Sequence, residues 1–284
     1  MPAKTLIAQH PAERDDIGDL VTRRPLPGPS LPQVDPFLFL NHHGPQIYPP
    51  NNRGLPFGPH PHRGFETVTF ILDGELAHRD SAGHESIIRA GGVQWMTAGS
   101  GLVHAEVSPE AFLREGGPME ILQLWVNLPS RLKMTRPRYV GVQAEAIPTL
   151  DCDGAVVRLI SGTWGGTTGP IENLTGVFMS VIDLDAGGRV GFGSLSGRNV
   201  FLYVVRGEVA VNGWAIAAWN LAELDLDGDT VEIAAKEPAR VVFGHAAPIG
   251  EPVVAHGPFV MNTREEILHA IRDYQAGLFD NVSA

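Results

Sequence analysis

Two segments of the chain, residues 66–77 (ETVTFILDGELA) and 199–210 (NVFLYVVRGEVA), resemble each other closely. Both are rich in the β-branched and aromatic residues that favour strands, and both continue through a charged residue and a glycine into Glu and a second apolar run. Gly74 and Gly207 hold the same place in each copy, and we predict equivalent hairpin turns there, because Asp73-Gly74 is a turn signal. Such an internal repeat predicts two copies of a whole β domain.

The composition fits a chain of many short strands. There are 33 Gly and 23 Pro residues among 284, more turn-forming residues than a helical protein usually carries. Length alone allows one large β domain or two domains of about 140 residues each. The Gly- and Thr-rich stretch that starts at residue 146 favours two, with predicted boundaries at 1–145 and 146–284. Residues 1–34 are predicted to form a polar arm with one short strand.

One segment near the end has a helical pattern, over residues 263–277. Thr263 and Glu266 fit a capping box, and Gly277 is a suitable C-terminal stop. An apolar face recurs at helical spacing and comprises Ile267, Ala270, Ile271 and Tyr274. We expect this helix to cover the edge of a sheet and assign it no chemistry.

Charge and cysteine content restrict the partners and the compartment. A formal charge of −11 argues against direct binding to nucleic acids or to anionic membranes. The single cysteine, Cys152, allows no intrachain disulfide. The N-terminus lacks the apolar core of a signal peptide, and no stretch approaches the roughly 20 apolar residues of a membrane span. A cytoplasmic protein is therefore expected.

Two short motifs, His60-Pro61-His62 and His104-Ala105-Glu106, carry most of the chemical information. Side chains two residues apart point to the same face of a strand. Two neighbouring strands could therefore bring three imidazoles and one carboxylate to a single point. This donor set suits a divalent first-row metal, and four protein ligands can leave positions open for exchange. A metal with open positions usually implies chemistry or sensing.

The repeat offers a test of this interpretation. Counted back from the repeat glycine, the places of His60, His62 and Glu66 are held in the second copy by Gly193, Leu195 and Asn199. The second copy thus lacks the equivalents of these residues, and a metal site is expected in the first domain alone.

The pattern from Gly54 to Glu66, G-x5-H-x-H-x3-E, is the first motif of the cupins, which are two-sheet β-barrels that hold a metal inside. The longer run from His60 to Glu106 and the tail from Gly257 to Gly277 resemble the pirin family within the cupins. The likeness extends from about Asp35 to Phe279 and is densest between His60 and Leu128. It implies an all-β fold of two tandem cupin (double-stranded β-helix) barrels with a short C-terminal helix, and a metal in the first barrel only.

When the pirin ligands are carried over by position, the resemblance implies that the ligands are His60, His62, His104 and Glu106. They usually hold one Fe2+ per chain. The spacing does not distinguish iron from Mn, Ni, Cu or Zn. Glu66 is the alternative carboxylate, because the glutamate of this motif binds the metal in ordinary cupins.

Some pirins resemble quercetin 2,3-dioxygenases, which implies oxygenolytic ring opening of a quercetin-like flavonol by dioxygen. Glu106 would then serve as ligand and as base towards the substrate hydroxyl. The alternative is a non-catalytic, iron- and redox-sensing regulator that binds a transcription factor or a metabolic enzyme. A sugar-phosphate isomerase is less favoured, because no cluster of Lys and Arg lies near the motif to hold a phosphate.

Several further residues are candidates for lesser roles. We expect solvated side chains at His78 and His84. We expect His42 and His43 to form a polar loop end, or one of them to line the pocket or to donate a hydrogen bond that orients a metal ligand. Core packing or substrate contact is expected of Trp95 and Trp125, and pocket-lining roles are possible for Arg63 and Gln123.

Overall fold

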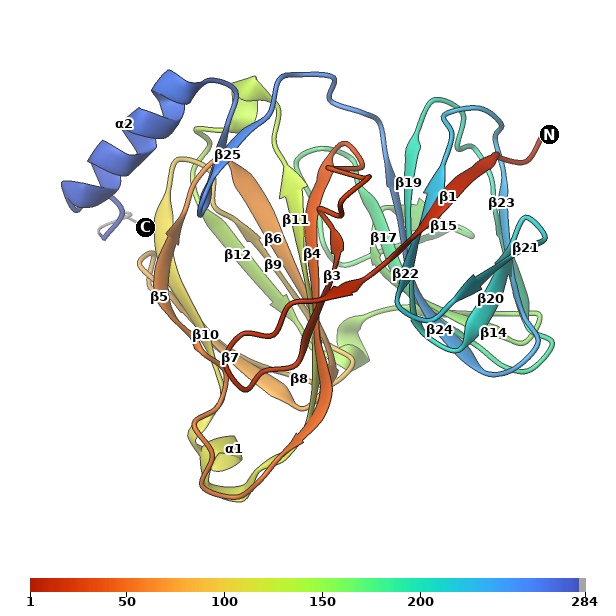
Figure 1. Ribbon diagram of the computed structural model, residues 1–284, viewed down its shortest axis with the longest axis horizontal. Helices are drawn as coiled ribbons and strands as arrows, with labels where there is room; N and C mark the ends of the chain where they lie inside the picture. Colours follow the sequence, from red (N-terminus) through yellow and green to blue (C-terminus); the bar gives the residue numbers. More distant parts are fainter. Residues whose placement is uncertain (281–284) are drawn as a thin grey trace. The chain divides into compact units, whose positions relative to one another are not determined.

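The computed structural model describes residues 1–280, and these are mostly β, with 54% strand and 9% helix. The strands form two barrels, each built from a seven-stranded and a four-stranded sheet (Figure 1). The predicted all-β fold of two barrels with a C-terminal helix is confirmed.

The first barrel holds the predicted ligands. Its seven-stranded sheet has the order β12-β9-β6-β11-β4-β3-β2, and its four-stranded sheet the order β5-β10-β7-β8. The bounds are β2 Glu13–Arg14, β3 Thr22–Leu26, β4 Phe37–Tyr48, β5 Phe57–His62, β6 Phe65–Asp73, β7 Glu75–Asp80, β8 Glu85–Arg89, β9 Val93–Thr97, β10 Leu102–Val107, β11 Gly117–Asn127 and β12 Arg138–Val142. Helix α1 (Glu110–Glu115) and the 3-10 turns Ser130–Leu132 and Ala144–Ala146 connect strands.

Strand β6 is an inner strand of the first barrel's larger sheet. It pairs antiparallel with β11 on one side and β9 on the other, and its residues Phe65 to Leu72 are all buried. A strand covered on both faces is largely apolar, because each fully buried aliphatic or aromatic side chain contributes about 1.5–3 kcal/mol. Polar residues within such strands therefore need a partner inside the barrel.

The second barrel repeats this plan. Its larger sheet has the order β1-β22-β19-β24-β17-β14-β13, and its smaller sheet the order β18-β23-β20-β21. The bounds are β1 Leu6–Pro11, β13 Thr149–Cys152, β14 Ala155–Ser161, β17 Phe178–Leu184, β18 Arg189–Phe192, β19 Asn199–Arg206, β20 Glu208–Val211, β21 Trp214–Ala217, β22 Asn220–Leu224, β23 Val231–Ala235 and β24 Ala239–Ala246. A small pair, β15 (Thr163–Trp164) and β16 (Thr167–Thr168), lies between β14 and β17. The interior is one large apolar cluster.

Gly74 and Gly207 hold equivalent places, but the predicted hairpin turns are wrong. Strand β7 pairs with β8 and β10 rather than with β6, so Gly74 is a corner at which the chain passes from the larger sheet to the smaller. Gly207 does the same between β19 and β20. Both glycines have positive φ, 84° and 76°, and an added Cβ would lie 2.6 Å from a carbonyl oxygen, that of Pro118 or Pro238. Glycine is needed at both corners for conformation and for space.

Neither barrel is continuous in sequence. Contacts group residues 1–13 and 24–38 with 145–248 into one compact unit, and residues 14–23 and 39–144 with the chain from Ile249 onward into the other. Strand β1 extends the second barrel's sheet beside β22, as β12 extends the first barrel's beside β9. The predicted boundary at 145–146 would instead place the N-terminal arm in the first domain and the C-terminal helix in the second. This boundary stays a prediction.

The C-terminal segment belongs to the first barrel's unit. It comprises β25 (Val254–His256), β26 (Phe259–Met261) and helix α2 (Arg264–Gln275). The predicted capping box of Thr263 and Glu266 is present. Ile267 and Ala270 are buried in a cluster with Phe259, Met261 and Phe279. Among the described residues, no helix is long and apolar enough to cross a membrane.

Candidate metal centre

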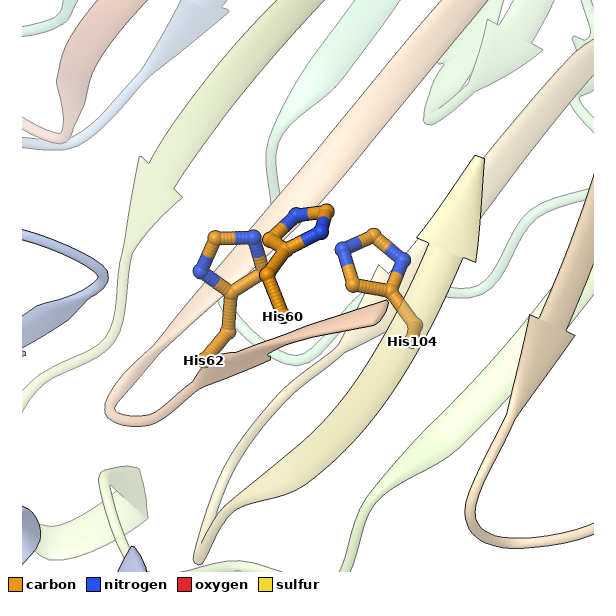
Figure 2. A group of neighbouring side chains, drawn as sticks. All are labelled: His60, His62 and His104. Carbon is orange, nitrogen blue, oxygen red and sulfur yellow. The ribbon is translucent and has the colours of Figure 1, made fainter. Parts of the chain in front are cut away.

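Strands β5 and β10 bring the three predicted histidines together. They pair antiparallel, with His60 opposite His104 and His62 opposite Leu102. Alternation along β10 turns Leu102, His104 and Glu106 into the barrel, where all three are buried. Figure 2 shows the three imidazole rings beside one another, His60 and His62 from one strand and His104 from its neighbour.

The rings are close enough to share one ion. One nitrogen from each of His60, His62 and His104 lies within 4.8 Å of the others, and this is the one such group of His, Cys, Asp or Glu found in residues 1–280. Ring centroids are 4.4–4.9 Å apart. The two motifs, separated by 41 residues, thus form a compact cluster of nitrogens.

Backbone carbonyls orient two of the rings. Nδ1 of His60 donates to the carbonyl oxygen of Gly58 at 2.7 Å, and Nδ1 of His62 donates to that of Pro258 at 3.2 Å. Because a carbonyl only accepts, each Nδ1 carries the proton and each Nε2 keeps its lone pair. Metal-binding histidines are commonly held in this way, with the second nitrogen bonded to a fixed acceptor.

Several nitrogens of the cluster have no hydrogen-bond partner. Nε2 of His62 and both ring nitrogens of His104 are buried without one. A buried polar atom without a partner costs about 1–3 kcal/mol, so unpaired nitrogens at one point indicate a ligand. Burial, reinforced by the neighbouring rings, lowers the pKa of His62 to about 3 and that of His104 well below its usual value. The rings of His62 and His104 are therefore neutral at pH 7, the form that binds metals, and the donor set of three imidazoles fits a first-row metal ion.

Glu106 lies beside this cluster but outside the group of converging ligand atoms. Its Oε1 accepts hydrogen bonds from Thr69 Oγ1 (2.9 Å) and from Gln94 Nε2, and its Oε2 accepts one from Gln123 Nε2 (2.5 Å). A carboxylate can accept this many hydrogen bonds through its two oxygens. Glu106 stays a predicted ligand, and binding a metal would require it to exchange at least part of this network.

Sequence reasoning did not find Gln94 and Thr69. Both are buried polar residues, Gln94 on β9 and Thr69 on β6, and each stands between two apolar neighbours, which is the signal that could have identified them. Gln123, expected as a pocket group, contributes by holding Glu106. Arg63, also expected there, is instead bonded to the carbonyl of Ser100 and to Asp273 of α2.

Glu66, the alternative carboxylate, is also buried. Its Oε1 accepts a hydrogen bond from Thr97 at 2.6 Å, whereas its Oε2 has no partner. Burial raises the pKa of Glu66 to about 7, and the Thr97 hydrogen bond opposes the shift. A carboxyl with such a pKa is about half protonated at neutral pH, and a protonated carboxyl is a poor metal ligand. Glu66 also lies outside the converging group.

Aromatic rings surround the histidines on the larger-sheet side. Trp125 lies edge-on to His62 at 5.4 Å, and it packs on Phe65 (4.4 Å) and Phe39 (4.6 Å). These rings limit the access of water to one side of the cluster. Trp95 is 3% exposed on the neighbouring strand β9.

Other histidines form separate pairs. The expectation of a solvated His78 is wrong: the side chain is buried, accepts or donates a hydrogen bond with Asp80, and stacks on Tyr139. Register explains this, since β7 pairs with β10 and places His78 opposite Glu106. His42 is buried against Glu120 at 3.0 Å, and His43 bonds Thr22 at 2.8 Å, so neither is a polar loop end.

The fold places the three converging histidines, which could bind a metal ion, in the first of two barrels. A family model described as Pirin matches residues 19–126, and one described as Pirin C-terminal cupin domain matches residues 179–280. A pirin-like protein from Caulobacter vibrioides is 42% identical over 93% of this chain and 94% of its own. The chain therefore belongs to the pirin family.

Two further relatives bear on activity. A Pseudomonas aeruginosa protein provisionally named a quercetin 2,3-dioxygenase is 38% identical over 87% of both chains. A crystal structure described as quercetin 2,3-dioxygenase from Acinetobacter baumannii is 34% identical, with a TM-score of 0.92 over 99% of this chain and 100% of its own.

Proposed function

We propose that the first barrel binds one divalent first-row metal ion, with Fe2+ as the physiological ion, through His60, His62 and His104. Glu106 is the proposed fourth ligand. The observation that carries this proposal is the set of buried imidazole nitrogens that converge without hydrogen-bond partners. When bound, the metal would supply Lewis acidity towards a substrate hydroxyl and a redox centre for dioxygen.

The proposed reaction is the oxygenolytic ring opening of a quercetin-like flavonol. Its support is the likeness to the relatives from Pseudomonas aeruginosa and Acinetobacter baumannii, which carry that activity in their names. The chain's own contribution would begin with orientation, since the carbonyls of Gly58 and Pro258 hold two rings in one tautomer. Trp125 and Phe65 would exclude water from one side.

Glu106 is the proposed base towards the flavonol hydroxyl. It is 1% exposed, lies two residues from His104 on the inward face of β10, and is held by three donors from β6, β9 and β11. If one donor were released, an oxygen of Glu106 could accept the hydroxyl proton while the other donors kept the side chain in place.

The test combines metal analysis with turnover. Protein purified without oxygen is analysed for metals, and oxygen uptake is measured with quercetin for the Fe, Mn, Ni and Cu forms. We expect about one metal per chain and oxygen uptake that an anaerobic control abolishes. His104→Ala should lose metal and turnover, whereas the matched control His84→Ala, on a half-exposed ring outside the cluster, should keep both.

The results of this test distinguish the proposed metal site, the dioxygenase reaction and the alternative regulator. Full metal content in His104→Ala would contradict the site. Metal binding without flavonol turnover in any metal form would contradict the dioxygenase. That result would favour the regulator, whose binding to a protein partner should then change with the redox state of iron.

A further inference from the structure

The second barrel has a pocket of its own. It has a volume of about 650 Å³, and its lining residues all lie between residues 162 and 245, within one compact unit. The polar and charged lining residues include Ser194, Arg198, His245 and Glu172, and Ile171 and Phe178 contribute apolar surface.

When the two repeat copies are aligned, this pocket corresponds to the surroundings of the candidate metal site in the first barrel. Trp125 pairs with Thr67 in the first barrel, and His245 pairs with Val200 in the second. Thr67 and Val200 each directly follow the repeat-matched residues Glu66 and Asn199. In the second barrel, His245 therefore holds the position that corresponds to Trp125 in the first.

Arg198 holds the place of Phe65 in the repeat. Phe65 directly precedes Glu66, and Arg198 directly precedes the matching residue Asn199. In the first barrel the pair is apolar, with the Phe65 and Trp125 rings 4.4 Å apart. In the second barrel the pair is polar, and Nε of Arg198 donates to Nδ1 of His245 at 2.7 Å. The second barrel thus combines the loss of the metal-ligand equivalents with a cation beside the same position.

Arg198 is fixed in place by neutral acceptors. Its Nη2 donates to the carbonyl oxygens of Gly176 (2.9 Å) and His245 (3.4 Å). His245 is itself held by parallel stacking on Phe178, with centroids 4.7 Å apart and 5° between the planes. The guanidinium is thus oriented by contacts that use Nε and Nη2 and leave Nη1 for another partner.

The charge of Arg198 has no counter-ion in the part of the chain that the structure describes: none of the ion pairs found there includes it. Partial burial lowers the pKa of Arg198, and no carboxylate opposes that shift. Burial also lowers the pKa of His245 to about 3, so its ring is neutral and, with Nδ1 accepting from Arg198, carries its proton on Nε2. A half-buried, oriented guanidinium without an anion is suited to bind a carboxylate.

The remaining lining residues restrict the ligand. Glu172 is exposed at the pocket and adds a carboxylate to its lining. A single negative charge is favoured over the double charge of phosphate, since Glu172 repels a dianion more strongly than a monoanion.

We propose that this pocket is a second ligand site that binds a small organic monocarboxylate, with its carboxylate on Arg198 and its apolar part against Ile171 and Phe178. The site is independent of the metal centre and of the proposed dioxygenase reaction.

Benzoate is the probe, and its binding is measured by isothermal titration calorimetry on the full-length, metal-loaded protein. We expect one benzoate per chain, with much weaker binding of neutral benzamide and of inorganic phosphate. Arg198→Gln should weaken benzoate binding at least about tenfold, the loss typical of one charge-assisted contact. Arg189→Gln is the matched control, because it removes an exposed guanidinium paired with Asp153 in the same barrel, and it should bind as wild type does.

Two further variants guard against misfolding. Arg198→Lys keeps the charge but loses the planar fork, and it should bind benzoate more weakly than wild type and more tightly than Arg198→Gln. His245→Phe keeps a ring on Phe178 but removes the Nδ1 acceptor, and it should weaken binding several-fold. Any one of three results would overturn the proposal. The first is the absence of benzoate binding, and the second is the same benzoate affinity in Arg198→Gln, Arg198→Lys and wild type. The third is tighter binding of phosphate than of benzoate. Metal content and flavonol turnover should be unchanged in the Arg198 variants, so a failure here is distinct from a failure of the proposed function.

Discussion

The ring of His62 donates a hydrogen bond from Nδ1 to the carbonyl oxygen of Pro258, a residue from the C-terminal segment. The neighbouring backbone reinforces this contact, since the amide of Val260 donates to the carbonyl of Arg63 at 3.0 Å. The segment from Ile249 onward therefore takes part in orienting a metal ligand. The attachment of α2 to the barrel should influence how tightly the metal is held.

Arg63 is the side chain that anchors this segment. It donates to the carbonyl of Ser100 (2.7 Å) and to Asp273 on α2 (2.8 Å), and it lies over the Phe279 ring. We expect Arg63→Met to speed metal release to a chelator, up to about tenfold, because a support of ligand orientation is lost. Stopped-flow measurement with a coloured chelator checks this. Arg79→Met, at an exposed arginine of β7, is the control, and equal release rates in both variants would contradict the expectation.

Glu106 and Glu66 can be distinguished by paired substitutions. Glu106→Gln should lower metal affinity about 10- to 100-fold, because an anionic donor is lost. Glu66→Gln should retain nearly full metal content, because its hydrogen bond to Thr97 can persist through the amide oxygen. Metal analysis after dialysis against graded chelator gives both affinities. The opposite order would identify Glu66 as the carboxylate ligand.

The two corner glycines should be sensitive to the addition of a single methyl group. Gly74→Ala and Gly207→Ala should each destabilise the fold by about 2–4 kcal/mol, because a positive φ and a carbonyl contact combine. Gly83→Ala and Gly213→Ala are the controls, since both have similar φ and open space around the added Cβ. Urea unfolding measures all four. If the controls lost as much stability as the corner variants, the carbonyl contact would have no part in the effect.

Lys133 should make stability depend on pH above neutrality. Its ammonium is buried and donates to the carbonyls of Gly64 and Val260 and to Asn127 Oδ1, and burial lowers its pKa to about 8. Between pH 8 and the unfolded value of about 10.4 the unfolded chain holds the extra proton, so this group makes the free energy of unfolding rise with pH.

The measurement compares urea unfolding of wild type and Lys133→Met between pH 7 and 9.5. Wild type should gain up to about 1.4 kcal/mol per pH unit relative to the variant above pH 8. Lys133→Met should also be less stable at pH 7 by about 2–4 kcal/mol, because three buried acceptors lose their donor. Lys236→Met, at an exposed lysine, should show neither effect. Parallel pH profiles for wild type and Lys133→Met would rule out this role.

The sequence predicted the histidine cluster because its information is local. His60 and His62 share a strand face by the two-residue period, and the repeat glycines aligned the barrels well enough to show that the second lacks the equivalents of these ligands. The convergence of Thr69, Gln94 and Gln123 on Glu106 could not be predicted, since these residues come from three strands whose pairing depends on long-range register.

The predictions that were wrong, for the turn at Gly74 and for His78, also concern features that depend on long-range strand pairing. Asp73-Gly74 is a good local turn signal, but the barrel uses the positive φ of glycine to move a strand between sheets. His78 is flanked by polar residues, and only the pairing of β7 with β10 buries it. The domain boundary at 145–146 stays a prediction, and the places of strand β1 and of the C-terminal segment depend on contacts between distant parts of the chain.

The contact between His62 and Pro258 also sets an order of events during synthesis. His60, His62 and His104 leave the ribosome long before Pro258, so a nascent chain can pair β5 with β10 while one ligand still lacks its backbone acceptor. Metal captured at that stage would meet an incompletely oriented site. Full metal affinity should therefore arise only near the end of translation, after almost the whole second barrel has been made.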